Sequence, residues 1–468
     1  MKNNINNFDE NLIKLANLFS EVGETLYAVG GMVRNPLLGL PISDIDVCSK
    51  MPVDEVINFC KKNDLHFVPK GLAYGTVEIH IGGISVEHTT FRADSYGEGG
   101  SHKPESVKFS TSLESDAVRR DFTVNALYCN ILSGEIKDPT GGLDDIKNGI
   151  IRATSKDAHI ILKDDALRIL RMVRFAAQLG FDIDNDTFLA AKENISGLQH
   201  ISPERIRDEL NKILLSDVRY KEYVYDENNS VLKGLELLKE LGAFKYIIPE
   251  LELGIGIEQK PTHHKYDVFN HALHTCACSA PSLIMRLAGL LHDIGKPIVF
   301  KENGNMHFHD MVGETLSRDI LKRLKYDNAT VDAVSKIVRY HMYDLNGTAK
   351  GKTLKRQFAR WGYDFTLRIC EIREADVHGS GFIKGEVKSA VRWRKVLDDM
   401  VMRGAPFSEK DIACTGKDIA LWLSIPPSKE IGEIKQKLLM HCAVFPKHNN
   451  KQDLEWVVKT IYKKDKKF

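Results

Sequence analysis

Two regions with different hydrophobic patterns follow one another along the 468-residue chain. Between about Leu26 and Ile151, short β-rich runs alternate with glycine turns. These runs predict strands in LYAVGG, SDIDVC, GTVEIHI, ISVEHTTF, SVKFS and NALYCNI. From about Lys156 onward, apolar residues recur at steps of three and four, which predicts helices in DALRILRMVRFAAQLG, SPERIRDELNKILLS and SVLKGLELLKELGA. Strands followed by helices predict an α+β fold.

Composition narrows the class of protein. Lys plus Arg number 65 and Asp plus Glu number 64, so any polyanionic partner must be held by a local basic patch. No apolar run reaches about 18 residues, which is the length typical of a transmembrane helix. The N-terminal stretch carries Asp9 and Glu10 where a signal peptide is apolar, and it predicts a short amphipathic helix. The eight cysteines include no CxxC pair, which favours buried thiols in a reducing compartment. We expect a cytoplasmic protein.

Two glycines and an arginine follow the first predicted strand. Gly30 and Gly31 let backbone amides approach a ligand without a Cβ in the way, and the helix that begins there directs N–H groups toward an anion. Arg34 lies one turn into that helix, where its guanidinium suits a phosphate oxygen. The two glycines alone are also typical of an ordinary turn between a strand and a helix.

Three acidic residues lie on predicted strands nearby. Asp44 and Asp46 are two residues apart, so on a strand both side chains project from one face. Such carboxylates repel each other unless a cation lies between them, and Mg²⁺ uses this arrangement. Glu87 could add a third carboxylate. The aspartates alone indicate a polar strand end, but beside the glycines and Arg34 they predict two-metal phosphoryl or nucleotidyl transfer.

Asp165 and Arg168 are three residues apart in a predicted helix. One interpretation is a surface ion pair of little energetic value. The other is a reader of nucleobases, because aspartate only accepts and arginine only donates hydrogen bonds. Cytosine and adenine present an amino group beside an unprotonated ring nitrogen, which matches this pair. Uracil and guanine would leave polar groups unpaired at about 1–3 kcal/mol each. The pair therefore predicts use of CTP and ATP.

A run of motifs resembles the class II CCA-adding enzyme and bacterial poly(A) polymerase family. These motifs are GGMVRN with DID, EHTTFRAD, RRDFTVNALY, DPTGGLDDI, DDALRILRMVRFA and SPERIRDEL, in that order over about residues 26–215. The resemblance implies a small mixed β-sheet nucleotidyltransferase head, followed by all-helical neck, body and tail regions. It also implies dependence on Mg²⁺.

The resemblance assigns roles to individual residues. Asp44 and Asp46 would bind Mg²⁺, with Glu87 as the third catalytic acid. The residues expected to bind the nucleotide are Gly30, Gly31, Arg34, Arg120, Asp121, Asn125, Asp165, Arg168, Arg171 and Arg174. Asp121 could instead form an internal salt bridge with a neighbouring arginine, and Arg171 and Arg174 could lie on the helix surface or in stabilising ion pairs. Asn35 stands where the family commonly has aspartate, which removes a charge but keeps a hydrogen-bond acceptor.

A second cluster of potential metal ligands follows in HHKYDVFNHALHT, LAGLLHDIGKP, HFHDMVGE, VRYHM and EADVHG. Imidazole and carboxylate suit a divalent metal, although histidines can also be ordinary polar helix surface. The pattern resembles the HD superfamily of metal-dependent phosphohydrolases. The residues that match its core pattern are His271, His292, Asp293 and Asp376, with His309 and His341 as further candidates. This resemblance implies a second divalent metal and either hydrolysis of phosphoesters at RNA ends or a degenerate structural domain that carries an RNA-binding surface.

The expected organisation has four parts: a catalytic head (1–151), a helical neck and body with the base-reading helix (152–260), an HD-type domain (261–380) and a tRNA-binding tail (381–468). The loop RADSYGEGGSHKPES (92–106) looks full length, which favours addition of the final A. CTGKDIALWLSIPPSKEIGEIKQKLL resembles a tRNA-contacting region. The basic segments 352–361, 391–395 and KKDKKF are further candidates for RNA contacts.

Together these features predict an enzyme that adds or repairs the 3′-terminal CCA of tRNA from CTP and ATP and releases pyrophosphate. The expected partners are tRNA and the two nucleotides, with no membrane and no obligate protein partner. One alternative is a poly(A) polymerase or an enzyme that adds only part of CCA. An alternative of another class is an HD-type phosphohydrolase with a vestigial head.

Overall fold

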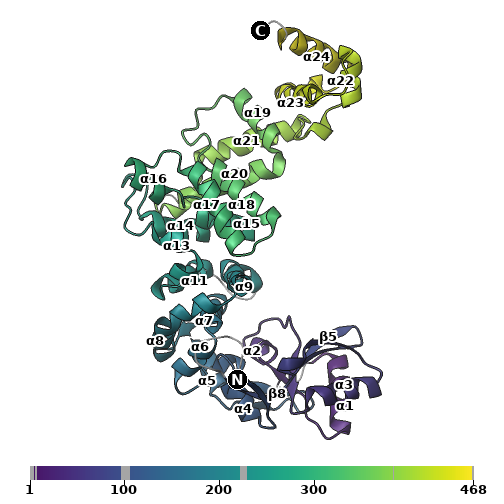
Figure 1. The fold of residues 1–468 in the computed structure, drawn as a ribbon, viewed down its shortest axis with the longest axis vertical. Helices are drawn as coiled ribbons and strands as arrows, with labels where there is room; N and C mark the ends of the chain where they lie inside the picture. Colours follow the sequence, from purple (N-terminus) through teal and green to yellow (C-terminus); the bar gives the residue numbers. More distant parts are fainter. Residues whose placement is uncertain (1–4, 6–7, 96–105, 222–228, 383, 466–468) are drawn as a thin grey trace. The chain divides into compact units, whose positions relative to one another are not determined.

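The computed structural model describes residues 5, 8–95, 106–221, 229–382 and 384–465. The chain forms two compact units, Met1–Glu252 with Arg323–Lys325 and Leu253–Lys322 with Tyr326–Phe468. Strands occur in the first unit and are followed by helices, which confirms the predicted α+β fold (Figure 1). Among the described residues, none of the helices has the length and apolar character needed to cross a membrane.

A seven-stranded mixed sheet forms the centre of the first unit, in the order β3-β4-β5-β2-β1-β8-β9. Its strands are β1 (Tyr27–Val29), β2 (Asp46–Ser49), β3 (His66–Gly71), β4 (Thr76–Ile81), β5 (Ile84–Thr90), β8 (Tyr128–Asn130) and β9 (Ile136–Lys137). β2 and β5 are parallel, and the other neighbours are antiparallel. Two smaller ladders pair β6 (Arg92–Ser95) with β7 (Ser106–Phe109) and β10 (Ile150–Ile151) with β11 (Asp182–Ile183). The sequence pattern did not predict β3 or β9 of the large sheet, nor β10 and β11, and β6 lies where a loop was expected.

One face of the large sheet is covered by α1 (Glu10–Glu21) and α3 (Val53–Lys62). The rings of Phe19 and Phe59, one from each helix, lie 4.5 Å apart in this core. On β5, Val86 and His88 are fully buried whereas Glu87 is exposed. Because successive side chains of a strand point to opposite faces, the acidic residue lies on the face away from the core.

Further helices complete the first unit. They are α2 (Gly31–Leu37), α4 (Leu113–Val118), α5 (Gly142–Asn148), α6 (Ala158–Asp164), α7 (Leu167–Leu179), α8 (Asn185–Asn194), α9 (Pro203–Leu214), α10 (Ser216–Arg219), α11 (Ser230–Glu240), α12 (Phe244–Ile247) and α13 (Pro249–Glu252). α7 is buried along almost its whole length and packs against α9, α10 and α11. The arginines of α7 are therefore held in fixed positions rather than spread over a solvated face.

The second unit is helical. Its helices are α14 (Val268–Cys278), α15 (Leu283–Leu291), α16 (Lys296–Asn303), α17 (His309–Arg323), α18 (Asn328–Tyr340), α19 (Gly351–Trp361), α20 (Tyr363–Gly379), α21 (Lys388–Met402), α22 (Gly416–Leu423), α23 (Lys429–Val444) and α24 (Lys451–Asp465). α14 packs against α15 and α20, and α15 also contacts α18. Asp267 and Ser282 accept hydrogen bonds from backbone N–H groups in the first turns of α14 and α15, which fixes where these helices begin.

Candidate active site and metal centre

Two carboxylates lie side by side on parallel strands of the head. The register of β2 and β5 places Asp46 opposite Glu87. Burial raises the pKa of Asp46 to about 6, and the negative charges of Glu87 and Asp44 add to that effect. A divalent cation would relieve this repulsion, because it stabilises the ionised form of several carboxylates at once. The residues present therefore fit a metal site with oxygen ligands.

Asp44 lies outside the strand, so the prediction that both aspartates project from one strand face was wrong. β1 is only three residues long and pairs Ala28 with Val47, so its ladder with β2 ends before Asp44. Asp44 occupies a bend, its side chain is 75% exposed, and Arg219 Nη2 lies 3.3 Å from its carboxylate. It still lies close enough to Asp46 to raise the pKa of that carboxyl group.

A fourth acidic residue was missed by the sequence analysis. Glu78 on β4 lies opposite Glu87, so Asp46, Glu87 and Glu78 occupy one row across three neighbouring strands. Glu78 forms ion pairs with Lys70 and, at 3.1 Å, with His80 Nε2. The alternation in TVEIHI carries the signal, because it places Glu78 on the polar face of its strand.

A buried arginine forms the next part of the site. Gly30 precedes α2 with φ of +64°, a conformation that glycine adopts readily. Arg34 is almost fully buried and donates from Nη1 to Asn125 Oδ1, and from Nε and Nη2 to Asn35 Oδ1 at 3.1 and 2.8 Å. Burial lowers the pKa of Arg34. The amides of Asn35 and Asn125 are neutral, and the nearby Tyr220 and the charge of Asp121 offset only part of the effect of burial on this pKa.

Asn35 connects three parts of the first unit. Its side-chain oxygen accepts from Arg34, and its Nδ2 donates to Pro41 O at 2.8 Å and to the Tyr220 hydroxyl at 3.2 Å. Pro41 lies in the loop that leads to Asp44, and Tyr220 directly follows α10. An aspartate could not make the donor contacts, because a carboxylate only accepts hydrogen bonds.

The network continues into the buried helix α7. Asn125 Nδ2 donates to Asp121 Oδ1 at 3.0 Å, and Arg171 donates from Nε and Nη2 to Asp121 Oδ2 at 2.8 and 2.6 Å. Burial alone would raise the pKa of Asp121, but the Arg171 guanidinium holds it well below its usual range. Asp121 thus forms the internal salt bridge that was one of its two interpretations, with a partner 50 residues away.

Asp116 is a buried carboxylate that the sequence analysis did not single out, and it holds the two arginines of RRDFTVNALY in place. Asp116 is fully buried and accepts from Arg119 Nε at 2.9 Å, Arg120 Nε at 3.0 Å and the Tyr128 hydroxyl at 2.7 Å. Burial would raise the pKa of Asp116, but the two guanidinium groups lower it to about 2. Its carboxylate therefore stays charged and fixes the direction of Arg120.

The expected base-reading pair does not lie on one helix. α6 ends at Asp164, Asp165 has an extended backbone, and α7 begins at Leu167. Asp165 Oδ1 instead accepts from Leu167 N at 3.0 Å, at the start of the second helix. Arg168 donates to the carbonyl oxygens of Ile161 at 3.1 Å and Arg119 at 2.9 Å. The prediction that Asp165 and Arg168 lie on one face of a single helix was therefore wrong. Base reading by this pair stays a prediction.

Arg174 forms a stabilising ion pair, which was one of the alternatives predicted for it. Its Nε lies 3.0 Å from Glu209 Oε2, and both side chains are buried between α7 and α9. Burial lowers the pKa of Arg174 to about 10. The pair joins two helices of the first unit.

The HD-type residues of the second unit converge from separate elements. His271 on α14, His292 after α15 and Asp376 on α20 form one group, and Asp293, His309 and His341 form another. His271 Nε2 lies 3.1 Å from Asp376 Oδ1 and 3.2 Å from His292 Nε2. In the second group, His309 Nε2 lies 3.1 Å from Asp293 Oδ1 and 3.2 Å from His341 Nε2.

Asp293 joins the two groups, because its second oxygen, Oδ2, lies 3.1 Å from His292 Nε2. Lys296 Nζ contacts the same oxygen at 2.5 Å. The outer Nδ1 atoms of His292, His309 and His341 face main-chain carbonyls at 2.7–2.8 Å. This arrangement leaves each Nε2 directed inward, as second-sphere contacts do at metal sites. The donor set fits two neighbouring divalent ions.

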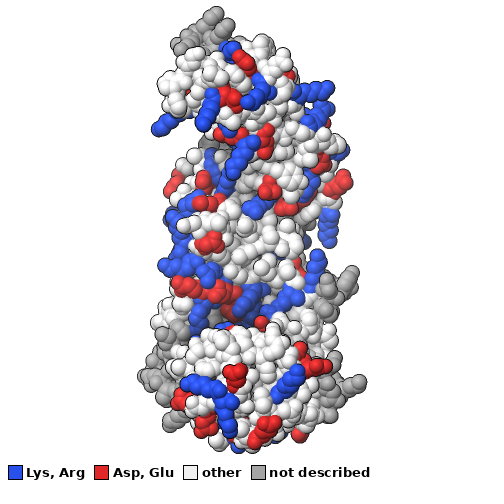
Figure 2. Space-filling model, turned by 90° about the vertical axis from the view of Figure 1, so that its right-hand side faces the viewer, with Lys and Arg blue, Asp and Glu red and all other residues white. Residues whose placement is uncertain are grey.

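Basic residues of the second unit lie among acidic ones (Figure 2). Lys352, Arg356 and Arg360 are exposed and four residues apart, so they form one stripe along α19. Within the described chain, none of the three forms an ion pair with a carboxylate. Lys352 Nζ lies 5.7 Å from the ring of Phe445, which stacks on His448 at 5.5 Å. Cations beside exposed rings are typical of RNA-binding surfaces.

Other predicted RNA-contacting parts are less informative. In the segment 391–395, Arg392 binds main-chain carbonyls and Arg394 pairs with Glu374. Most of the loop 92–106, residues 96–105, lies outside the described residues, and so do residues 466–468 of KKDKKF.

Three segments of the chain match models of known families. A family model described as the poly A polymerase head domain matches residues 26–152, an HD domain model matches 266–378, and a probable RNA and SrmB-binding site of polymerase A matches 180–221. The chain is 30% identical to the A-adding tRNA nucleotidyltransferase of Deinococcus radiodurans over 348 residues, covering 71% of this chain and 76% of that protein.

It is also 43% identical to a CCA-adding enzyme of Ligilactobacillus salivarius over 195 residues, covering 42% of this chain and 46% of the relative. The chain thus spans about half the length of the CCA-adding relatives that it matches. The crystal structure of the Bacillus stearothermophilus CCA-adding enzyme in complex with CTP shares the fold, with a TM-score of 0.68, 24% identity and 98% coverage of both chains.

Proposed function

The chain belongs to the class II CCA-adding enzyme and bacterial poly(A) polymerase family, and from this membership we propose that it adds the 3′-terminal CCA to tRNA from CTP and ATP. The observation that carries the proposal is the pairing of Asp46 with Glu87, on the face of the sheet away from α1 and α3, in a unit that also holds Arg34. The acids suit metal ions, and the arginine suits a triphosphate.

Metal binding is part of this proposal. Asp44 and Asp46 would hold Mg²⁺ with Glu87, since burial and the neighbouring carboxylates raise the pKa of Asp46 and a bound cation would oppose both effects. When bound, Mg²⁺ lowers the pKa of the RNA 3′-hydroxyl and balances the charge of the pyrophosphate that leaves. Arg219 now contacts Asp44 through an exposed pair, which costs little to separate.

The arginines of the head would bind the triphosphate. Arg34 is suited to this role because its hydrogen bonds go to Asn35 and Asn125, which are neutral. A phosphate oxygen would add a negative charge in direct contact with this buried guanidinium, where charge-assisted hydrogen bonds are strong. Arg120 is held in place by Asp116, and Asp121 positions Asn125 and Arg171 around the same network. Arg174 would support α7 rather than touch the nucleotide.

Base selection remains with Asp165 and Arg168 in this proposal. Asp165 would accept from the amino group of cytosine or adenine, and Arg168 would donate to the ring nitrogen. One guanidinium donor must then leave the carbonyl of Ile161 or Arg119. The ring nitrogen of the base would then replace one of these carbonyls as hydrogen-bond acceptor. A base that presents a donor at that position cannot replace the carbonyl, so Arg168 would keep its present contacts.

For the tRNA, the stripe Lys352–Arg356–Arg360 offers contacts to the phosphate backbone. The four-part division into head, neck and body, HD-type domain and tail belongs to the same proposal. A cytoplasmic location does too, supported by eight cysteines that form no disulfide in the described chain.

The test uses purified protein, tRNA that lacks CCA, Mg²⁺ and labelled CTP, ATP or both. Incorporation of two C residues followed by one A supports the proposal. Continued addition of A without C would indicate a poly(A) polymerase, and addition of C alone or of A alone would indicate a partial enzyme. Asp46→Asn and Glu87→Gln should each abolish incorporation, whereas the matched control Glu114→Gln, an exposed acid of the same unit, should leave it intact.

A second activity is favoured by a specific observation: Asp293 shares its two oxygens between the two histidine groups. We propose that this centre holds two divalent metal ions and hydrolyses phosphoesters. His271, His292, Asp293, His309, His341 and Asp376 would hold the metal, and Lys296 and Arg373 line the same cavity. Asp376→Asn should abolish hydrolysis but spare nucleotide addition. Loss of both activities on this substitution would contradict two independent sites.

A further inference from the structure

One wall of the metal cavity in the second unit is not a helix. The cavity of about 550 Å³ is lined in part by Met342, Leu345 and Asn346. These residues belong to the segment 341–350, which connects α18 to α19 and begins with the proposed metal ligand His341. The position of this segment therefore sets the width of the cavity and affects the placement of one ligand.

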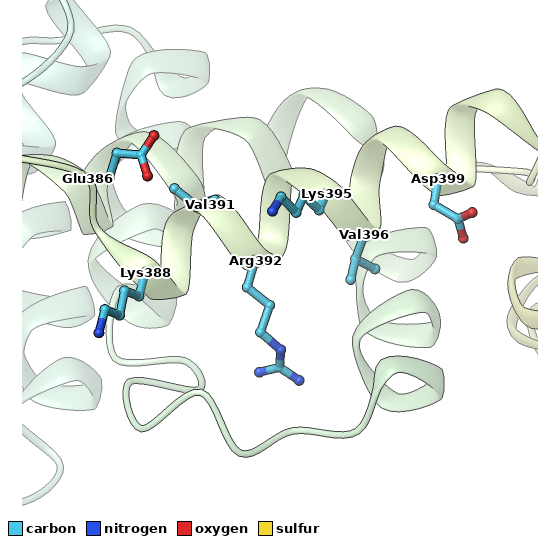
Figure 3. A pocket seen from close by; sticks show the side chains of 7 residues that line it. All are labelled: Glu386, Lys388, Val391, Arg392, Lys395, Val396 and Asp399. Atoms are coloured by element: carbon cyan, nitrogen blue, oxygen red, sulfur yellow. The ribbon is translucent and has the colours of Figure 1, made fainter.

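The segment is held from its other side by α21. Arg392 Nη1 donates to Gly347 O at 2.5 Å and lies 3.2 Å from Asp344 Oδ2, and Nη2 donates to Ala349 O. Trp393 Nε1 donates to the same oxygen of Asp344 at 3.2 Å. Figure 3 shows the Arg392 side chain leaving α21 toward the loop that passes beside the helix. One guanidinium thus holds three points of the segment.

The segment needs such support because its backbone is strained. Asp344 has φ of +47°, a left-handed conformation that a residue with a Cβ adopts at a cost. Its Oδ1 accepts from Ala349 N at 2.8 Å, so the carboxylate holds the turn from inside. Arginine suits the outer contact because its planar donors can bind a carboxylate and several carbonyls together.

We propose that Arg392 is a positioning residue for the metal cavity. By holding the segment from outside, it fixes the wall that Met342, Leu345 and Asn346 present to the cavity. Met342 and Leu345 are largely apolar, so this wall would contact the organic part of a phosphoester rather than its phosphate. This role in substrate binding rests on the proposed phosphohydrolase function, whereas the structural role of Arg392 does not.

The experiment compares full-length wild type with Arg392→Ala, Arg392→Lys and the control Lys395→Ala. Lys395 is exposed and lines the same surface groove on α21 (Figure 3), and no contact with the segment is recorded for it in the described chain. Three quantities are measured: hydrogen exchange of peptides that cover 342–350, the rate at which EDTA removes Mn²⁺, and hydrolysis of bis(p-nitrophenyl) phosphate.

For Arg392→Ala we expect exchange at Gly347 and Ala349 to accelerate about tenfold, since two carbonyls and a carboxylate each lose one donor. Removal of Mn²⁺ should accelerate severalfold. KM should rise at least about threefold while kcat changes by less than about twofold, because the wall contacts substrate and not the reacting atoms. Arg392→Lys should lie between Arg392→Ala and wild type, and Lys395→Ala should match wild type.

Unchanged exchange in Arg392→Ala would overturn the proposal, as would faster exchange with unchanged EDTA removal and KM. Tryptophan fluorescence checks that each variant keeps its fold, and Arg392→Lys carries the comparison if the alanine variant unfolds. Wild-type protein that hydrolyses no phosphoester would contradict the hydrolase function. Exchange and EDTA removal would then still decide the role of Arg392.

Discussion

Replacing Asp116 by asparagine should destabilise the first unit and leave the second unit unaffected. The carboxylate of Asp116 is fully buried and accepts from Arg119, Arg120 and Tyr128 within 3.0 Å. Asparagine has nearly the same size, so the packing around the site stays the same. What is lost is the negative charge opposite two guanidinium groups, and one acceptor becomes a donor that faces other donors.

The pKa of Asp116 sets the size of the effect. Burial would raise that pKa, but Arg120 and Arg119 lower it from 3.8 to about 2. A shift of this size corresponds to about 2 kcal/mol of folding stability at neutral pH. Separating a buried ion pair also leaves an uncompensated cation, so we expect the free energy of unfolding to fall by about 2–4 kcal/mol.

The sign of the pH dependence follows from the direction of the shift. Because the folded-state pKa lies below the unfolded-state value, the stabilisation is fully present above about pH 4. It is lost as the pH falls toward about 2. The difference in stability between wild type and Asp116→Asn should therefore shrink over this range, and a difference that grew as the pH fell would contradict the assignment.

The assay uses the distribution of tryptophan in the chain. All four tryptophans, Trp361, Trp393, Trp422 and Trp456, lie in the second unit, so their fluorescence in urea reports that unit alone. Unfolding of the first unit is followed by hydrogen exchange of peptides from α4 and β8. Asp116→Asn should lower the urea midpoint of the exchange transition but not that of fluorescence. Equal exchange midpoints for Asp116→Asn and the control Glu114→Gln would refute this account of the ion pair.

Three further variants test the proposed function. Asn35→Asp should raise KM for CTP by about three- to thirtyfold, because the new carboxylate gives Arg34 a counterion and the hydrogen bond from Nδ2 to Pro41 O is lost. Steady-state kinetics at saturating tRNA measure this KM. Lys352→Ala combined with Arg356→Ala should reduce the slope of log Kd for tRNA against log salt by about 1.4–1.8, while Lys301→Ala with Lys322→Ala leaves it unchanged. Arg168→Ala should increase use of UTP relative to CTP by about tenfold or more, and unchanged discrimination in competition assays would argue against base reading.

Local signals predicted much of the head. Alternation in ISVEHTTF identified β5, and its register with β2 brings Asp46 and Glu87 together. The errors fall where tertiary structure decides the end of an element. Asp44 leaves the strand because its partner strand β1 is short, and Asp165 leaves the helix where α6 and α7 meet. Neither boundary is marked by a glycine or proline at the position itself.

The partners of buried charges were the least predictable part. Asp121 pairs with Arg171, which is 50 residues away. In the sequence, Asp116 is only an acidic residue of a short helix, and its contacts with Arg120 and Tyr128 become visible in the structure. Residue type indicated that these groups were polar, but hydrogen-bond partners distant in sequence depend on the packing of whole elements. In the second unit, the motifs contained all six metal-facing residues, yet the sharing of Asp293 between two groups required the structure.

The two acidic centres differ in what surrounds their carboxylates, and this difference predicts different metals. In the head, burial and neighbouring acids raise the pKa of Asp46, and all three proposed ligands are carboxylates. In the second unit, four of the six proposed ligands are histidines and two are carboxylates. Oxygen ligands favour Mg²⁺, whereas mixed imidazole and carboxylate sets favour Mn²⁺, Fe²⁺, Co²⁺, Ni²⁺ or Zn²⁺. Protein stripped of transition metals and supplied with Mg²⁺ should therefore add nucleotides but not hydrolyse phosphoesters. Equal support of both reactions by Mg²⁺ would contradict this distinction between the two sets of ligands.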